Sequence, residues 1–167
     1  MDFHLKELSP DDSESVYNML QRIGKNEYGF HNDVHGMTLP EFREWLVLQQ
    51  HWAQNQSLPE GYVQQWTYWL MFQNNPIGYG KLRKKVTEQS KHFGGNIGYA
   101  VDPLYRGKGF GKILFALLIQ QAKYNKIKEI YSTVEKPNVI SMKVHLDCGM
   151  NLINEDDKRW YFYSLIE

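Results

Sequence analysis

The stretch from Asp102 to Ala122, DPLYRGKGFGKILFALLIQQA, constrains the fold more than any other part of the chain. Three glycines alternate with other residues, three cations surround them, and an apolar, helix-forming run follows. A helix N-terminus exposes unpaired N–H groups, and glycines let the main chain approach an anion closely. Arg106, Lys108 and Lys112 add full charges. The segment therefore predicts a strand-to-helix connection that binds a phosphate or pyrophosphate; the alternative is a glycine-rich turn that merely joins two elements.

Spacing separates this segment from two other phosphate-binding loops. A P-loop requires Ser or Thr after its Gly-Lys pair, but Gly111 and Lys112 are followed by Ile113. A Rossmann fingerprint places Gly-x-Gly-x-x-Gly near the start of a βαβ unit. Here the pattern is Arg-Gly-x-Gly-x-Gly and it lies late in the chain. Neither of these nucleotide-binding folds is therefore expected.

Length and charge restrict the class of protein. The 167 residues predict a single domain over 1–167. Lys plus Arg number 19 and so do Asp plus Glu, so the net charge is zero, which argues against a nucleic-acid or membrane-surface binder. The single cysteine, Cys148, fits a reducing compartment, and the first residues do not resemble a signal peptide. A cytoplasmic protein is expected.

Residue patterns predict alternating strands and helices. Ser9 and Pro10 are expected to start a first helix that Gly24 ends, and the Thr38–Glu41 capping box starts a second. Polar loops are expected at 25–37 and 84–91. Strands are expected at 4–8, 65–72, 77–83, 95–101 and 127–134, with a short helix from near Asn138 and two final strands around an Asp-Asp turn. The sum is a mixed α/β layer around a central sheet.

Two motifs together resemble the GNAT (GCN5-related) N-acetyltransferases. VDPLYRGKGFG resembles motif A of that family, whose pattern [RQ]-x-x-G-x-[GA] is matched by Arg106, Gly109 and Gly111. NVISMKVHLDCGM resembles the family's second conserved segment, with Asn138, Ser141, Gly149 and Met150 in register. The patterns at 58–69 and 94–101 resemble a bacterial subgroup of predicted acetyltransferases of unknown substrate. The resemblance implies the GNAT acyl-CoA N-acyltransferase fold, a central, mostly antiparallel sheet flanked by about four helices.

The resemblance also implies a co-substrate, acetyl-CoA, and no metal. Tyr99, Ala100 and Val101 would pair with the pantetheine arm and the thioester carbonyl. The pyrophosphate would lie on the main chain of the glycine segment, which comprises Arg106, Gly107, Lys108, Gly109, Phe110, Gly111 and Lys112. Asn138 and Ser141 would contact the cofactor from the next helix.

The expected chemistry is direct attack of an amine on the thioester. His145 occupies the position where the family often has a Tyr general acid, and it is predicted to protonate the leaving thiolate; the alternative is simple surface placement. Where some relatives carry a base Glu, this chain has Thr133. Glu135 is the candidate for the general base or for a carboxylate that binds the substrate. The alternative is that Glu135 is a solvated charge on a loop.

Helical spacing assigns the faces of the helix that carries His145. Asn138, Ser141 and His145 are spaced to share one face. Ile140, Val144 and Cys148 mark another face, which is expected to meet the core. Cys148 is interpreted as a buried small residue rather than a nucleophile.

The acceptor site is expected on the loop between the first two helices. Tyr28, Phe30 and Asp33, with His31 and Asn32, would hold a small, modestly basic amine or an α-amine rather than a lysine of a basic tail; alternatively, the rings cover the core. A homodimer is possible. The alternative function is a non-catalytic acyl-CoA-binding sensor or interaction module on the same fold.

Overall fold

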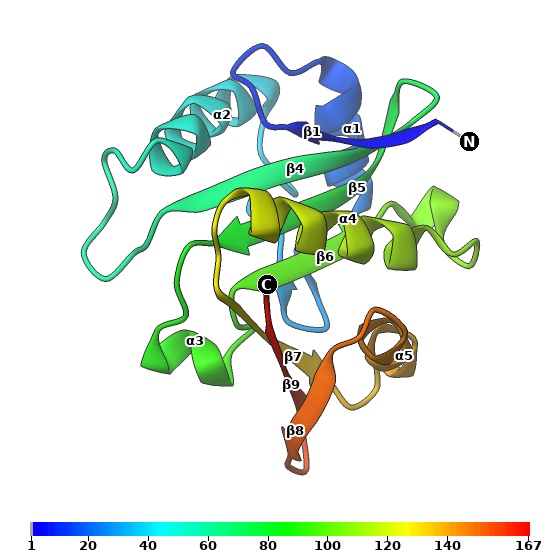
Figure 1. Cartoon of the computed structure of the whole chain (residues 1–167). Helices are drawn as coiled ribbons and strands as arrows, with labels where there is room; N and C mark the ends of the chain where they lie inside the picture. Colours follow the sequence, from blue (N-terminus) through cyan, green and yellow to red (C-terminus); the bar gives the residue numbers. More distant parts are fainter. Residues whose placement is uncertain (1) are drawn as a thin grey trace.

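Two antiparallel sheets form the centre of the computed structural model, which describes residues 2–167 (Figure 1). The first sheet has the order β1-β4-β5-β6. Its strands are β1 (Phe3–Glu7), β4 (Gln65–Phe72), β5 (Asn75–Arg83) and β6 (Ile97–Val101). The second sheet has the order β7-β9-β8, with β7 (Glu129–Glu135), β8 (Asn151–Glu155) and β9 (Arg159–Leu165).

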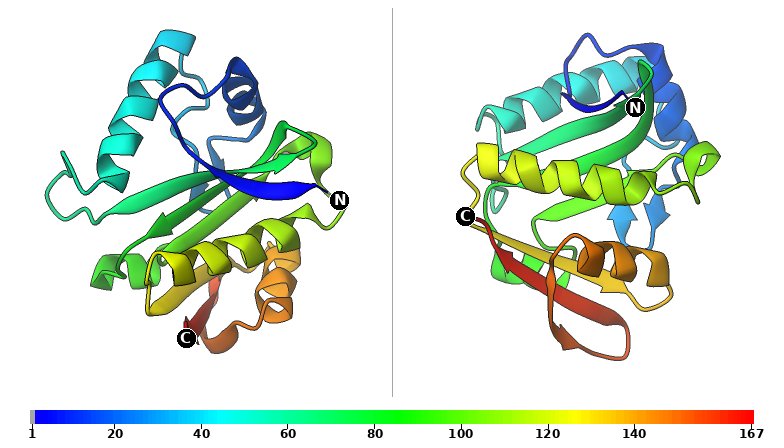
Figure 2. Two further views of the ribbon diagram at one scale, coloured as in Figure 1. Left: turned by 45° about the horizontal axis from the view of Figure 1, so that its top comes forward. Right: turned by 45° about the vertical axis from the view of Figure 1, so that its right-hand side comes forward.

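Helices cover both faces of the first sheet (Figure 2). One face carries α1 (Glu14–Arg22) and α2 (Leu39–Ala53), and the other carries α4 (Phe110–Tyr124). Successive residues of β5 face opposite sides of the sheet. Tyr79 packs on Trp45 of α2, whereas Gly80 leaves room for Leu118 of α4. The remaining elements are the hairpin β2 (Asn26–Glu27) and β3 (Phe30–His31), α3 (Glu88–His92), the 3-10 turn η1 (Pro103–Tyr105) and α5 (Val139–Asp147).

The two sheets touch at one end of β6 and diverge from there. The Asn96 N–H donates to the Tyr131 carbonyl at 3.0 Å, and the Asn96 side-chain oxygen accepts from the Tyr131 N–H at 2.9 Å. The chains are so close that a Cβ on Gly95 would lie 1.9 Å from the Tyr131 carbonyl oxygen. Because β6 and β7 belong to different sheets, the edge of β6 that faces β7 is not covered by a strand. The candidate site lies in the opening that results between the two sheets.

Several expectations about single elements were wrong. The first helix begins after Ser13 rather than at Ser9. Asp12 explains the difference: its carboxylate accepts from the Ser9 N–H at 2.9 Å and from the Trp69 indole at 2.7 Å, which fixes a turn before the helix. Residues expected as loops hold the β2–β3 hairpin and α3, where Thr87 and Ser90 form a reciprocal cap. With the short α3, five α-helices are found among residues 2–167, which agrees with the expected fold of a mostly antiparallel sheet flanked by about four helices.

The capping box of α2 and the strand from Gln65 agree with the sequence prediction, and β6 begins at Ile97, two residues later than expected. The Thr38 hydroxyl accepts from the Glu41 N–H at 3.4 Å, and the Glu41 carboxylate accepts from the Thr38 N–H at 2.7 Å. Within the described part of the chain, no helix combines the length and apolar character that a membrane span needs.

Candidate active site

The first four residues of the glycine segment, 106–109, form an open loop between η1 and α4. Gly107 and Gly109 have φ angles of 76° and 84°, a region that side chains with a Cβ rarely adopt. A Cβ on either residue would meet nothing within 4 Å, so the space in front of the loop is open. Gly111 serves packing instead, because a Cβ there would lie 3.3 Å from the Tyr99 ring. Two glycines thus shape the loop and the third seats the first turn of α4 on β6.

The three cations of the segment have different surroundings. Arg106 turns toward the β2–β3 hairpin, where it pairs with Glu27 and donates to the Val101 carbonyl at 2.9 Å. Lys112 lies 3.5 Å from the Asp147 carboxylate of α5. Lys108 takes part in no ion pair among residues 2–167; its ammonium lies 5.7 Å from the Tyr105 ring centroid. Lys108 is therefore the cation most available to an anionic ligand.

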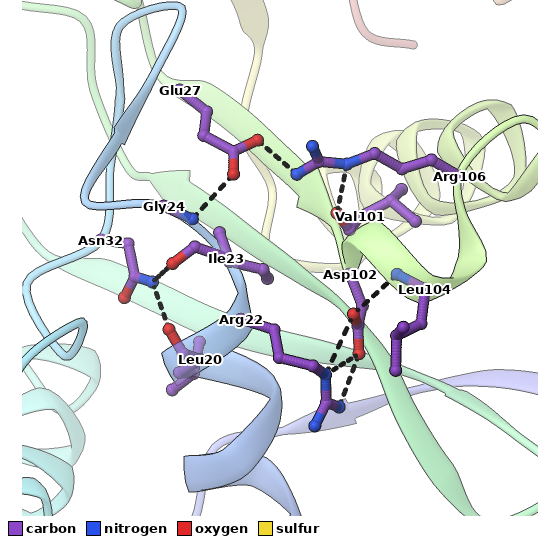
Figure 3. A network of polar contacts seen from close by, with 10 residues as sticks. All are labelled: Leu20, Arg22, Ile23, Gly24, Glu27, Asn32, Val101, Asp102, Leu104 and Arg106. Carbon is purple, nitrogen blue, oxygen red and sulfur yellow. Dashed lines mark hydrogen bonds and ion pairs between the residues drawn. The ribbon is translucent and has the colours of Figure 1, made fainter.

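An ion pair with a buried carboxylate anchors the start of this loop to α1 (Figure 3). Asp102 is fully buried and accepts from the Arg22 guanidinium at 2.6 Å. The same carboxylate accepts from the Leu104 N–H at 3.0 Å and so caps η1. In the same view Glu27 links the Gly24 N–H, at 2.7 Å, to Arg106. The network joins the loop, α1 and the hairpin.

Backbone alternation decides which groups of β6 face the opening. Val101 and Asp102 lie opposite Gly78 and Ile77 of β5, and the Asp102 N–H donates to the Ile77 carbonyl at 2.9 Å. Since hydrogen-bonding direction alternates along an antiparallel strand, Tyr99 and Val101 direct main-chain groups away from β5, and Ala100 directs its own toward β5. Of the three residues expected to meet the pantetheine arm, two therefore present main-chain groups to the opening.

A cavity of about 280 Å³ lies between the sheets where they diverge. Its walls come from the hairpin, from β5 and β6, and from β7 with the first turns of α5. It brings together Tyr28, Phe30, Tyr99, Glu135, Asn138, Ser141 and His145 from the residues expected on sequence grounds. The glycine loop follows β6 after the η1 turn, so the cavity and the loop lie one after the other along this part of the chain.

His145 is 2% exposed and lies among aromatic rings. Its ring centroid is 4.4 Å from that of Phe115 and 4.8 Å from that of Phe162. Nδ1 lies 2.7 Å from the Ser141 carbonyl oxygen, and Nε2 lies 2.7 Å from the Ser132 hydroxyl. Burial lowers the pKa of His145 to about 4. The ring is therefore neutral at pH 7, with Nδ1–H donating and Nε2 accepting.

Tyr99 extends this polar cluster. Its hydroxyl donates to the Ser141 hydroxyl oxygen at 3.0 Å, and burial raises the pKa of Tyr99 to about 12. The Tyr99 phenol therefore keeps its proton throughout the physiological pH range.

Asn138 caps α5, since its side-chain oxygen accepts from the Ser141 N–H at 3.3 Å.

Glu135 lies at the end of β7 and lines the cavity beside the hairpin. Its side chain is 33% exposed, and the Arg159 guanidinium lies 3.9 Å from it. Thr133 has a structural contact instead, because its hydroxyl accepts from the Gly94 N–H at 2.9 Å. Glu135 is thus a carboxylate of the cavity rather than a charge on a separate loop.

The hairpin carries two of the three residues expected to hold the acceptor. Tyr28 and Phe30 line the cavity, whereas Asp33 is exposed beyond the hairpin and does not. Asn32 is fully buried and donates to the Leu20 and Ile23 carbonyls at 2.8 and 2.9 Å, so it closes the end of α1. Asp33 therefore does not line the cavity with the two rings, although its charge acts on Lys81.

The faces of α5 correct one expectation. Asn138, Ser141 and His145 do share a face, but Ser141 and His145 of that face are buried. Ile140, expected to meet the core, is 80% exposed. The reason is that the polar face closes the cavity, which the helical spacing alone does not reveal. Cys148 is half-buried, and burial raises the pKa of its thiol, as expected for a residue that is not a nucleophile.

Sequence reasoning missed the basic side of the cavity. Lys81, Arg83 and Arg159 line it together with Glu27 and Ser132. A signal was present in β5, where the sequence YGKLR places two cations two residues apart in a strand that is otherwise buried. Two neighbouring cations on one face of an inner strand indicate a ligand or a partner carboxylate.

Comparisons with known proteins agree with this geometry. Residues 33–150 match the Acetyltransferase (GNAT) family. The uncharacterized N-acetyltransferase YfmK of Bacillus subtilis (strain 168) is 31% identical over 70 residues, which is 42% of this chain and 47% of that relative. The chain thus matches less than half the length of this curated relative.

Solved structures show the same fold over the whole chain. The ribosomal-protein-S5-alanine acetyltransferase of Vibrio fischeri superposes with a TM-score of 0.75 at 16% identity, covering 100% of this chain and 94% of that one. The Campylobacter jejuni N-acetyltransferase PseH in complex with acetyl coenzyme A gives 0.64 at 16% identity, covering 99% and 100%. Because the family match at 33–150 covers more than half of the chain, the chain belongs to the GNAT acetyltransferase family, as its motifs implied.

Proposed function

We propose that the protein transfers the acetyl group of acetyl-CoA to a primary amine of a small acceptor. The observation that carries the proposal is the continuity of the site along β6. The uncovered edge of this strand borders the cavity at its start and leads through the η1 turn to the open Gly107–Gly109 loop at its end.

The residues present suit acetyl-CoA. The open space before Gly107 and Gly109 admits phosphate oxygens to the first N–H groups of α4, and Lys108 supplies an unpaired charge. The main-chain groups of Tyr99 and the Val101 N–H are available to an amide-containing arm, whereas the Val101 carbonyl accepts from Arg106. When bound, acetyl-CoA supplies an activated acyl group. PseH was crystallised with acetyl coenzyme A, which agrees with this co-substrate.

Glu135 is our proposed acceptor of the amine's proton. An amine must be neutral to attack a thioester, so a base in the cavity is needed. Glu135 lines the cavity next to the hairpin that would hold the acceptor. A lysine side chain has a pKa of about 10.4, so its neutral form at pH 7 costs about 5 kcal/mol, whereas an α-amine at about 8 costs about 1 kcal/mol. A lone carboxylate base therefore favours an α-amine or another weakly basic amine.

His145 stands at the family's Tyr position, but it has no spare proton in this arrangement. Its Nδ1–H is donated to the Ser141 carbonyl, and the neutral ring accepts from Ser132. We therefore propose a positioning role for His145 in place of the proton donation expected from the sequence. It holds Ser132 of β7 and the first turn of α5, and through Ser141 it orients the Tyr99 hydroxyl.

The test is thiol release from acetyl-CoA in the presence of a panel of primary amines, with mass spectrometry of each acceptor. The proposal predicts stoichiometric release and an acceptor heavier by one acetyl group. Tight coenzyme A binding with no transfer to any amine would instead support the sensor or interaction module. Homodimer formation stays a prediction, which sedimentation velocity tests.

A further inference from the structure

Two cations of β5 enter the cavity side by side. Lys81 and Arg83 are two residues apart in one strand, so their side chains point to the same face of the sheet. That face also carries the buried Tyr79, and both cations line the cavity. Neither cation belongs to any of the ion pairs found among residues 2–167.

The protein gives these two cations neutral partners. The Lys81 ammonium donates to the His31 carbonyl and lies 4.6 Å from the Phe30 ring centroid and 5.0 Å from that of Tyr79. The Arg83 guanidinium donates to the Gly95 carbonyl at 3.1 Å. An ammonium has three N–H donors and a guanidinium has five, so most of their donors remain available to a ligand.

The carboxylates that line the same cavity already have cationic partners. Glu27 pairs with Arg106 and also accepts from a main-chain N–H, and Glu135 lies near Arg159. Burial and the charge of Arg83 lower the pKa of Lys81 to about 8, and the charge of Asp33 offsets them only in part. A buried charge that remains unpaired is costly, and a carboxylate of a ligand would remove that cost.

We propose that the acceptor amine carries a carboxylate and that Lys81 and Arg83 bind this carboxylate. The inference rests on the proposed function and narrows its substrate class to amino-acid-like acceptors. Their carboxylate lies against β5, and their amine turns toward Glu135 on the opposite wall. Phe30, in contact with the Lys81 ammonium, covers the apolar part of the acceptor. The carboxylate makes the amine more basic than that of the corresponding amide, so rates are compared per neutral amine.

The test compares free acids with their amides in two readouts. First, kcat/KM is measured with acetyl-CoA for the twenty common amino acids and the corresponding amino-acid amides. We expect a preference for at least one acid over its amide of about tenfold or more, the value of one charge-assisted hydrogen bond. In Lys81→Met and Arg83→Gln variants this preference falls by about tenfold, while activity with the amide is retained. Lys85→Gln, which changes an exposed cation just beyond β5, keeps it.

Second, calorimetry measures binding of N-acetyl amino acids and of their amides to the protein with coenzyme A, which requires no turnover. Tighter binding of the acid, lost in Lys81→Met, supports the inference even if transfer fails and the proposed function falls. The inference is overturned if amides bind and react as well as acids. It is also overturned if neutral or cationic amines are acetylated while no acid is bound or acetylated.

Discussion

Acid should destabilise this protein through His145 in particular. Burial lowers its pKa from 6.5 to about 4, so the unfolded chain binds a proton between these values that the folded chain does not. Stability therefore rises with pH across this window: the contribution is present above pH 6.5 and is lost as the pH falls toward 4. Across the whole window His145 changes the free energy of unfolding by about 3 kcal/mol, and between pH 8 and pH 5 by about 2 kcal/mol.

Urea denaturation at pH 8, 7, 6 and 5 measures this effect when the wild type is compared with His145→Gln. The amide keeps a hydrogen-bonding group near Ser132 but does not titrate. All other titrating groups are common to both proteins, so they cancel in the difference. The stability advantage of the wild type should shrink by about 2 kcal/mol from pH 8 to pH 5. A constant difference would refute the neutral, buried state of His145 and would restore it as a proton donor.

Three further perturbations separate the roles of the other charged residues. Asp102→Asn replaces the buried carboxylate that pairs with Arg22 by a neutral amide and should cost about 1–3 kcal/mol of stability in thermal denaturation, because the hydrogen bonds to Arg22 and to the Leu104 N–H lose the charge of their acceptor. An unchanged stability would mean that the pair does not anchor the loop. Lys108→Gln should weaken coenzyme A binding and reduce its dependence on salt in calorimetry, whereas Lys123→Gln at the far end of α4 should do neither. Glu135→Gln should lower kcat/KM by about 10²-fold or more with unchanged coenzyme A affinity, and wild-type activity would exclude Glu135 as the base.

The sequence predicted the part of the site that depends on local backbone chemistry. Glycines at 107, 109 and 111 before an apolar run predicted an open helix N-terminus, and the positive φ angles of Gly107 and Gly109 confirm the conformation. The capping box at Thr38 is equally local, since Thr and Glu three residues apart satisfy one another. Such signals depend on neighbours in the chain and can therefore be read from the sequence.

The remainder depends on contacts between distant segments. Asp12 looks like an acidic residue of a first helical turn, yet its bond to Trp69 draws it into a turn before the helix. Ile140 looks like a core residue, yet it is exposed because Ser141 and His145 close the cavity from the same helix. Helical spacing groups residues by face but does not tell which face packs inward.

The cations of the cavity show the same limit. Arg106 was expected to add charge to a phosphate site, and its side chain pairs with Glu27, which is 79 residues away in the chain. Lys81 and Arg83 were passed over because a strand pattern gives their face but not the element that lies above it. The β2–β3 hairpin supplies that element, and it is too short to be predicted from residue pattern.

Calorimetric titration with coenzyme A tests the central claim that the Gly107–Gly111 loop holds the cofactor. The comparison is between the wild type, Gly109→Val and Gly61→Val. Both glycines have positive φ angles, 84° and 80°, and open space where a side chain would stand, so the two variants impose a similar backbone strain. Gly61 lies in the loop between α2 and β4, outside the site. The account predicts at least about tenfold weaker binding for folded Gly109→Val and wild-type binding for Gly61→Val. Wild-type affinity in folded Gly109→Val would contradict it.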